Sequence, residues 1–139
     1  MLVLDTNVIS EALKPQPDAR VQAWLVSQPL ASVFTTAISQ AEILYGVALL
    51  PEGRRKSMLL TAAVLMFEED FRGRVLPFDS EAATIYGTLA SARRQDRLPF
   101  SFADAQIAAI TQSRGGRLAT RNVRDFAGSG IEIVNPWET

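Results

Sequence analysis

Short apolar runs that alternate with longer helix-like segments are the feature that most constrains the fold of this chain. The first run, residues 2–4, ends abruptly at Asp5, and the apolar spacing of a helix follows it directly. The later strand-like runs are residues 31–36, 75–78, 117–120 and 131–134. Strands that alternate with helices in this way predict an α/β fold in which helices cover both faces of a mostly parallel sheet of about five strands.

Length and composition predict one globular domain over residues 1–139. Hydrophobic residues make up 47% of the sequence, enough for a sizeable core. No apolar run approaches the roughly 20 residues of a membrane span, and no charged leader with a cleavage site precedes the first strand, so we expect neither membrane insertion nor export. The absence of cysteine excludes disulfides and is typical of the reducing cytoplasm.

The sequence contains neither histidine nor cysteine, which restricts the chemistry that an enzyme of this kind can perform. No imidazole is available as a general base, and no thiolate is available as a nucleophile or zinc ligand. Any catalysis must therefore rest on carboxylates, hydroxyls, lysine or arginine, or on a hard metal ion held by oxygen atoms.

The net charge of −1 and the sequence pI of about 5.4 exclude a basic field over the whole molecule. Nucleic-acid binding would have to rest on local clusters of basic residues, although each cluster also suits ordinary solvated surface. The clusters are Arg54, Arg55 and Lys56; Arg93, Arg94 and Arg97; and Arg114, Arg117, Arg121 and Arg124.

Two further segments bear on surface and organisation. The helix predicted over residues 54–71 is apolar nearly all round, so part of its surface is expected to face a partner subunit or a peptide. A polar stretch, residues 93–99, separates the helix that begins after Asp79 from the helix that begins at Ser101.

Four acidic residues follow predicted strands or begin a neighbouring helix. Asp5, Glu42 and Asp125 come after the first, second and fourth strands, and Asp104 joins them if its helix packs beside the first strand. Because parallel strands end at one edge of the sheet, these carboxylates would repel one another unless a cation lay between them. Oxygen ligands alone favour Mg²⁺ or Mn²⁺, and such a site suits hydrolysis of a phosphodiester.

Local helix capping is the alternative explanation for the same acids. Asp5 is a favoured N-cap residue, Ser39 and Glu42 have the spacing of a capping box, and Ser101 with Asp104 comes close to one. Asp125 also suits a surface turn, and we interpret the remaining acids, including Glu11, as solvated surface. Spacing alone therefore predicts a plausible acidic metal site and leaves the capping alternative open.

Four motifs in order resemble those of the PIN domain. The closest resemblance is to the VapC-type toxins of bacterial toxin–antitoxin pairs, particularly a FitB-like branch that ends in Asn-Pro-Trp, as residues 135–137 do here. The resemblance covers essentially the whole chain. The motifs are Leu4-Asp5-Thr6-Asn7, Ala41-Glu42, Phe102-Ala103-Asp104-Ala105-x-Ile107-Ala108 and Leu118-Ala119-Thr120-Arg121-Asn122-x-x-Asp125-Phe126.

This resemblance implies a three-layer α/β/α sandwich with strand order 3-2-1-4-5 and a homodimer. It implies a metal-dependent ribonuclease that is neutralised by a cognate antitoxin, with which it would assemble on operator DNA. The metal would be bound by Asp5 and Asp104, with Glu42 completing the site directly or through water. The other implied site residues are Asn122 and Asp125 in catalysis, and Thr6, Asn7 and Thr120 as residues that orient waters or carboxylates. In a ribonuclease, we expect the arginines near this site, especially Arg121 and Arg124, to hold the phosphates of RNA.

One departure from the family pattern concerns Asn122, where many relatives carry an aspartate. An amide oxygen can ligate a cation but brings no charge, so the affinity for metal would be lower unless Asp125 compensates. This departure supports a second hypothesis, a non-catalytic module that binds an antitoxin or operator DNA. A third hypothesis, a small-molecule phosphatase, is disfavoured because Asn7 stands where haloacid-dehalogenase-like enzymes carry a second aspartate.

Overall fold

The computed structural model describes residues 1–98 and 100–139. Short strands alternate with helices along the chain, as the sequence predicts. The strands are β1 (Leu2–Leu4), β2 (Val33–Thr36), β3 (Val75–Leu76), β4 (Arg117–Ala119) and β5 (Ile133–Val134). The helices are α1 (Thr6–Leu13), α2 (Ala19–Ser27), η1 (Leu30–Ser32), α3 (Ala37–Ala48), α4 (Arg54–Leu65), η2 (Met66–Asp70), α5 (Ser80–Gln95), α6 (Phe102–Ser113), α7 (Val123–Phe126) and η3 (Pro136–Glu138).

The five strands form one sheet in the order β3-β2-β1-β4-β5, and every pair is parallel. This confirms both the α/β class and the strand order implied by the family resemblance. The strand β3 lies at one edge of the sheet. The segment predicted for it, residues 75–78, contains Pro77, and an edge strand tolerates a residue that has no amide hydrogen to donate.

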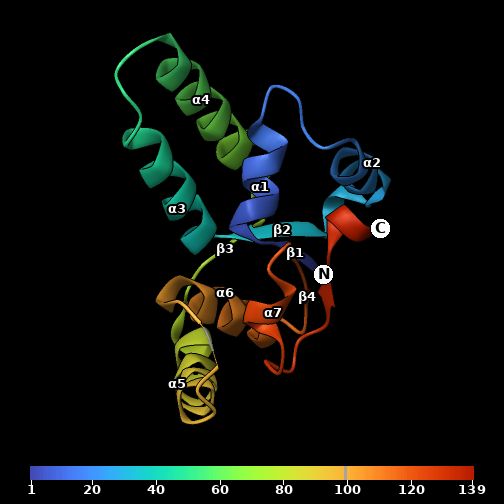
Figure 1. The fold of residues 1–139 in the computed structure, drawn as a ribbon, viewed down its shortest axis with the longest axis vertical. Helices are drawn as coiled ribbons and strands as arrows, with labels where there is room; N and C mark the ends of the chain where they lie inside the picture. Colours follow the sequence, from blue (N-terminus) through green and yellow to red (C-terminus); the bar gives the residue numbers. More distant parts are fainter. Residues whose placement is uncertain (99) are drawn as a thin grey trace.

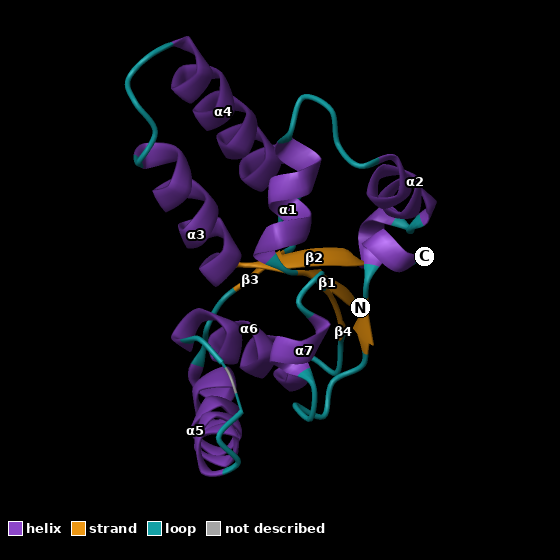
Figure 2. Cartoon of the chain, in the orientation of Figure 1, coloured by secondary structure: helices purple, strands orange, loops and turns teal. Residues whose placement is uncertain are grey.

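The sheet lies between two layers of helices (Figure 1), with α1 to α4 on one side and α5 to α7 on the other. Figure 2 shows the strands as a thin central layer between these helices. Successive side chains of β1 point to opposite faces of the sheet. Leu2 and Leu4 therefore pack in the core with α1, α2 and α4, whereas Val3 packs in the core on the other face with α5 and α6. Because both faces are covered, β1 is apolar throughout and fully buried.

The ends of the predicted elements needed several corrections. The segment predicted as strand over residues 31–36 begins as the 3₁₀ turn η1, and only Val33–Thr36 form the strand β2. The third and fifth strands are shorter than predicted because pairing is limited to two residues in each. The polar stretch predicted at residues 93–99 begins inside α5, and its last residue, Pro99, lies outside the described residues.

The helix predicted over residues 54–71 is α4 followed by the π-helical turn η2. Its apolar surface is only partly covered: Met58 is 61% exposed, Leu65 is 54% exposed and Leu60 is 43% exposed. The predicted surplus of apolar surface on this helix is therefore confirmed. Among the described residues, no helix combines the length and the apolarity needed to cross a membrane.

Candidate active site

Asp5 lies at the point where the central strand ends and α1 begins. Its backbone N–H donates to the Ala119 carbonyl at 2.9 Å, which continues the pairing of β1 with β4. Its Oδ1 accepts the N–H of Thr6 at 2.8 Å, and its Oδ2 accepts the Thr120 hydroxyl at 2.7 Å. Asp5 therefore is the N-cap residue of α1, as the capping alternative predicts, yet its second oxygen is directed to another strand. The side chain is 3% exposed.

The Thr120 hydroxyl connects three parts of the site. Besides donating to Asp5, its Oγ1 accepts the Asn7 side-chain amide at 3.2 Å and the Asn122 backbone N–H at 3.0 Å. The Asn7 Oδ1 accepts the backbone N–H of Arg121 at 3.2 Å. The three residues predicted to orient carboxylates or waters, Thr6, Asn7 and Thr120, thus all contact the acidic residues or the segment after β4.

Glu42 is an exposed residue in the interior of α3 and accepts the Thr6 hydroxyl at 2.6 Å. The predicted capping box of Ser39 and Glu42 is wrong, because α3 begins at Ala37 and the N-cap is Thr36, whose hydroxyl oxygen accepts the Ser39 N–H at 3.0 Å. The Ser39 hydroxyl oxygen instead lies 3.0 Å from the Thr6 hydroxyl oxygen, within hydrogen-bond distance. Capping therefore does not explain Glu42, and its carboxylate faces the end of β1.

Asp104 lies in the first turn of α6, and here the capping prediction is confirmed. The Ser101 hydroxyl oxygen accepts the Asp104 backbone N–H at 3.0 Å. Burial raises the pKa of the Asp104 carboxyl, and the negative charges of Asp125 and Glu42 act in the same direction, whereas hydrogen bonds from Ser101 oppose the shift. Asp104 is thus both a helix-start residue and a member of an acidic cluster.

Burial and mutual repulsion oppose the ionisation of Asp5 and Asp104 at the same time. The pKa of Asp5 is raised to about 6. Burial is the largest cause, hydrogen bonds from Thr120 and Thr6 offset part of the rise, and the charges of Asp104 and Glu42 add to it. A carboxyl with a raised pKa in a cleft is typical of sites that bind cations or transfer protons.

A cleft of about 400 Å³ opens over these groups. Most of the predicted site residues line it, but Thr120, Asp125 and Arg124 do not. Thr120 is buried beneath the cleft, where it holds Asp5. Arg124 is exposed on α7, and Asp125 acts on Asp104 only through its charge. The lining consists of Asp5, Thr6, Asn7, Ser10, Glu11, Lys14, Glu42, Asp104, Arg121, Asn122 and Trp137.

The donors of this cleft fit a hard divalent cation with a large share of water ligands. Within residues 1–98 and 100–139, no three acidic side chains stand close enough to surround one ion. Mg²⁺ commonly uses one or two carboxylates and retains several waters, which suits Asp5 and Asp104 with Glu42 reached through water. Every candidate ligand is a carboxylate, amide or hydroxyl oxygen, as such an ion prefers.

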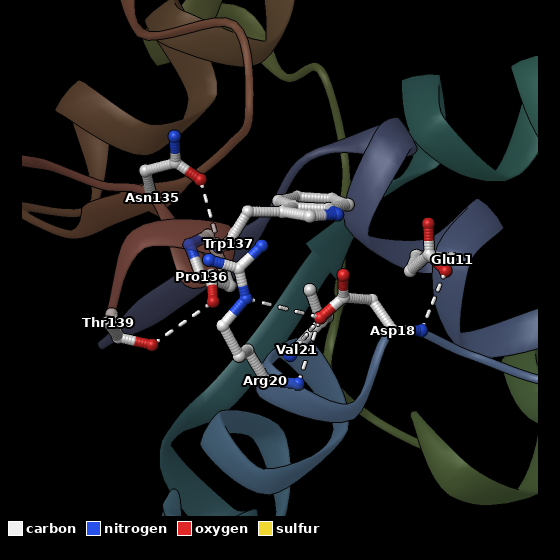
Figure 3. Close-up of polar contacts among 8 residues, drawn as sticks. All are labelled: Glu11, Asp18, Arg20, Val21, Asn135, Pro136, Trp137 and Thr139. Atoms are coloured by element: carbon white, nitrogen blue, oxygen red, sulfur yellow. Dashed lines mark hydrogen bonds and ion pairs between the residues drawn. The ribbon is translucent and has the colours of Figure 1, made fainter.

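The sequence did not indicate the roles of Glu11 and Lys14. Glu11 was interpreted as solvated surface, but it is 6% exposed. Its Oε2 accepts the Asp18 backbone N–H at 2.9 Å, its Oε1 accepts the Lys14 ammonium at 3.0 Å, and these contacts lower its pKa. The only available signal was the pair of prolines at 15 and 17, which fold the chain back so that α2 begins beside α1 (Figure 3).

Comparison with known proteins agrees with this geometry. The family model described as PIN domain matches residues 2–128, and the chain belongs to this family. It is 41% identical to Toxin FitB of Neisseria gonorrhoeae over 137 residues and 38% identical to VapC ribonuclease Y4jK of Sinorhizobium fredii over 138 residues, in each case over 99% of both chains. A solved structure of FitAB bound to an IR36 DNA fragment superposes with a TM-score of 0.91 and 41% identity, covering 99% of this chain and 96% of that one.

Proposed function

We propose that this protein is a divalent-metal-dependent endoribonuclease that acts as the toxin of a toxin–antitoxin pair. The observation that carries the proposal is the cleft at the end of β1, which Asp5, Glu42 and Asp104 all line. Similarity over nearly the whole length to a toxin and to a VapC ribonuclease supports the same activity. Because the proposed substrate is cellular RNA, we place its action in the cytoplasm.

The residues of the cleft have separate tasks in this proposal. Asp5 and Asp104 would hold Mg²⁺ or Mn²⁺, with Glu42 completing the site directly or through water. When bound, such an ion polarises a phosphate and makes a water more acidic and hence more nucleophilic. The Thr120 hydroxyl fixes the rotamer of Asp5, and the Thr6 hydroxyl holds Glu42 toward the cleft, so the carboxylates are oriented before the substrate arrives.

An apolar groove beside the cleft is the surface that we propose for antitoxin binding. The groove has a volume of about 850 Å³ and lies between α1, α3 and α4. Thr6, Ser10, Lys14 and Glu42 line both the groove and the cleft, so an antitoxin segment in the groove would end at the catalytic carboxylates. Exposed apolar surface of this size needs a partner, and an antitoxin placed there would both cover it and block RNA.

The proposed assembly is a homodimer that joins its antitoxin on operator DNA. The DNA-bound FitAB structure supports this assembly by analogy. Apolar side chains outside the groove offer a surface for the dimer: Tyr45 and Leu49 on α3 are 67% and 66% exposed, and Phe102 on the adjacent α6 is 66% exposed.

RNA cleavage by the purified, antitoxin-free protein tests the proposed activity. Total cellular RNA would be incubated with Mg²⁺ or Mn²⁺, or with chelator, and compared between the parent, Asp104→Asn and the exposed control Asp96→Asn. We expect cleavage that requires metal, falls at least about 100-fold in Asp104→Asn and persists in the control. Equal cleavage by Asp104→Asn and the parent would refute the assigned site and indicate a contaminating nuclease.

The non-catalytic alternative rests on one observation, the amide of Asn122 among the residues that line the cleft. Asn122→Asp adds a carboxylate there and separates the two hypotheses. If the parent is a weakly metal-binding nuclease, the variant should bind Mn²⁺ several-fold more tightly and cleave RNA faster. A variant that binds metal but still cleaves nothing, beside a parent that binds the antitoxin normally, would favour the binding module.

A further inference from the structure

Arg121 and Trp137 come from neighbouring strands and meet at the mouth of the cleft. Ala119 of β4 lies opposite Val134 of β5, and the Thr120 N–H donates to the Val134 carbonyl at 3.0 Å. Both strands therefore leave the sheet at the same level. The Arg121 guanidinium carbon lies over the Trp137 ring, 5.1 Å from its centroid, which is within the range of a cation–π contact.

The Trp137 ring is a fixed platform. Its backbone N–H donates to the Asn135 side-chain oxygen at 3.0 Å, and the Thr139 hydroxyl donates to the Pro136 carbonyl at 3.1 Å, so the last turn of the chain is closed by two local hydrogen bonds (Figure 3). The Trp137 side chain is 6% exposed and belongs to the same apolar core as Val21 of α2. Burial and the closed turn therefore hold the ring in one position beneath Arg121.

The Arg121 guanidinium is held in place without a direct hydrogen bond or ion pair. The Arg121 backbone N–H donates to Asn7, and the guanidinium carbon lies over the Trp137 ring. Among residues 1–98 and 100–139 the guanidinium makes no hydrogen bond and no ion pair within 4.0 Å. Its charge acts on the nearby carboxylate of Asp18 and helps to lower the pKa of that group. That carboxylate also accepts the N–H groups of Arg20 and Val21 and pairs with the Arg20 side chain, as Figure 3 shows.

We propose that the Arg121 guanidinium, held over the Trp137 ring, is a phosphate-binding subsite for an RNA strand that enters the acidic cleft. Trp137 is its positioning residue. Because this guanidinium makes no hydrogen bond or ion pair among the described residues, its N–H groups are available, and they match two oxygens of one phosphodiester. The cleft needs such a contact because its floor of Asp5, Asp104 and Glu42 repels a phosphate strand.

The inference rests on the proposed ribonuclease function, but RNA binding can be measured without cleavage. The probe is a short, labelled, single-stranded RNA of mixed sequence, titrated with the parent protein in chelator at several salt concentrations. We expect Arg121→Leu to bind about tenfold more weakly, since it loses a charge-assisted hydrogen bond to a phosphate. Its salt slope should fall by about one, because one phosphate contact is lost.

Arg72→Leu is the control, since Arg72 is an exposed arginine that does not line the cleft. It removes the same charge from the protein, so a general electrostatic effect would appear in both variants. We expect its affinity and salt slope to stay close to those of the parent. Equal losses in Arg121→Leu and Arg72→Leu would overturn the subsite.

The role of Trp137 is tested by a double-mutant cycle. Trp137→Leu should weaken RNA binding about threefold in the parent and have little further effect in Arg121→Leu, because its role is to hold that guanidinium. Trp137→Phe, which keeps an aromatic face, should restore most of the affinity. Equal losses from Trp137→Leu in both backgrounds, or no rescue by Trp137→Phe, would assign Trp137 to structure alone and overturn its positioning role.

Two outcomes distinguish a failure of the subsite from a failure of the proposed function. Arg121-dependent RNA binding in a protein that never cleaves RNA would support the subsite and reject the nuclease. Metal-dependent cleavage with the same KM in the parent and in Arg121→Leu would support the nuclease and reject the subsite. A rise in KM with a nearly unchanged kcat is the result expected for Arg121→Leu if both hold.

Discussion

The acidic cleft and the apolar groove share Thr6, Ser10, Lys14 and Glu42, yet they are built on different physical principles. Side chains in the cleft are fixed by hydrogen bonds between strands, and its carboxylates oppose one another. The groove, in contrast, is lined by the apolar side chains of α1, α3 and α4 and contains few groups that restrain a ligand's orientation.

This difference indicates what each surface requires. The cleft has a surplus of negative charge that a cation would relieve, so its stability should depend on pH and metal. The groove has a surplus of apolar area that a partner would cover, so its occupancy should depend on shape and on the absence of buried charge. One site therefore selects an ion and a polyanion, and the other selects a protein segment.

The largest expected effect concerns the stability of the metal-free cleft. Burial raises the pKa of Asp5 from its ordinary value of 3.8 to about 6, so the unfolded chain loses this proton at lower pH than the folded protein does. Stability from this group therefore falls as pH rises from about 4 to about 6, by about 3 kcal/mol in total. Asp5→Asn should remove that loss and be more stable than the parent near pH 7.

Urea unfolding in chelator at several pH values measures this effect, with Asp96→Asn as an exposed control. Added Mn²⁺ should make the parent more stable than Asp5→Asn, because the ion stabilises only a protein that binds it. If the parent and Asp5→Asn lose stability in parallel as pH rises, the loss does not come from ionisation of a buried Asp5 carboxyl.

The next effect concerns the groove. Met58→Glu places a charge in the lining, and its burial beneath an antitoxin segment should weaken antitoxin binding at least about 100-fold. Leu60→Glu is the control, because Leu60 is exposed on the same helix but lies outside the groove lining. Affinity for the cognate antitoxin can be measured by calorimetry. Similar affinities of the two variants would place the antitoxin elsewhere.

The smallest effect concerns the hydrogen bonds that orient the cleft. Thr120→Val keeps the volume of the side chain but removes the hydroxyl that holds Asp5, Asn7 and the Asn122 backbone. We expect RNA cleavage to fall about 10- to 100-fold, in line with the loss of groups that orient metal ligands. The matched variant Thr111→Val removes a buried hydroxyl that bonds only within α6. If the two variants are equally active, Thr120 is a structural residue only.

The elements of this fold were predictable where local pattern and burial agree. The apolar run before Asp5 predicted the central strand, and alternating strands and helices predicted a parallel sheet with helices on both faces. The strand order came only from the family resemblance, because periodicity does not specify which strands are neighbours. The ends of short strands were the weakest point, since pairing across the sheet, rather than propensity, decides where β2 and β5 begin.

The candidate site was predictable only in part for the same reason. The motifs predict Asp5, Glu42 and Asp104 as site residues. The spacing of Ser39 and Glu42 wrongly predicted that α3 begins at Ser39, whereas the N-cap residue of α3 is Thr36. The burial of Glu11 depends on a loop that folds back onto α1. The contact of Arg121 with Trp137 depends on the register of β4 and β5, which the sequence does not display.

Calorimetric titration of Mn²⁺ into the metal-free protein tests most directly whether Asp5 and Asp104 form a metal site. We predict saturable binding by the parent and by the exposed control Asp96→Asn. Binding should be lost in Asp104→Asn and in Asp5→Asn, and it should be weakened but retained in Asp125→Asn, which acts only through its charge. Undiminished binding by both Asp5→Asn and Asp104→Asn would contradict the assigned metal site and, with it, the proposed mechanism.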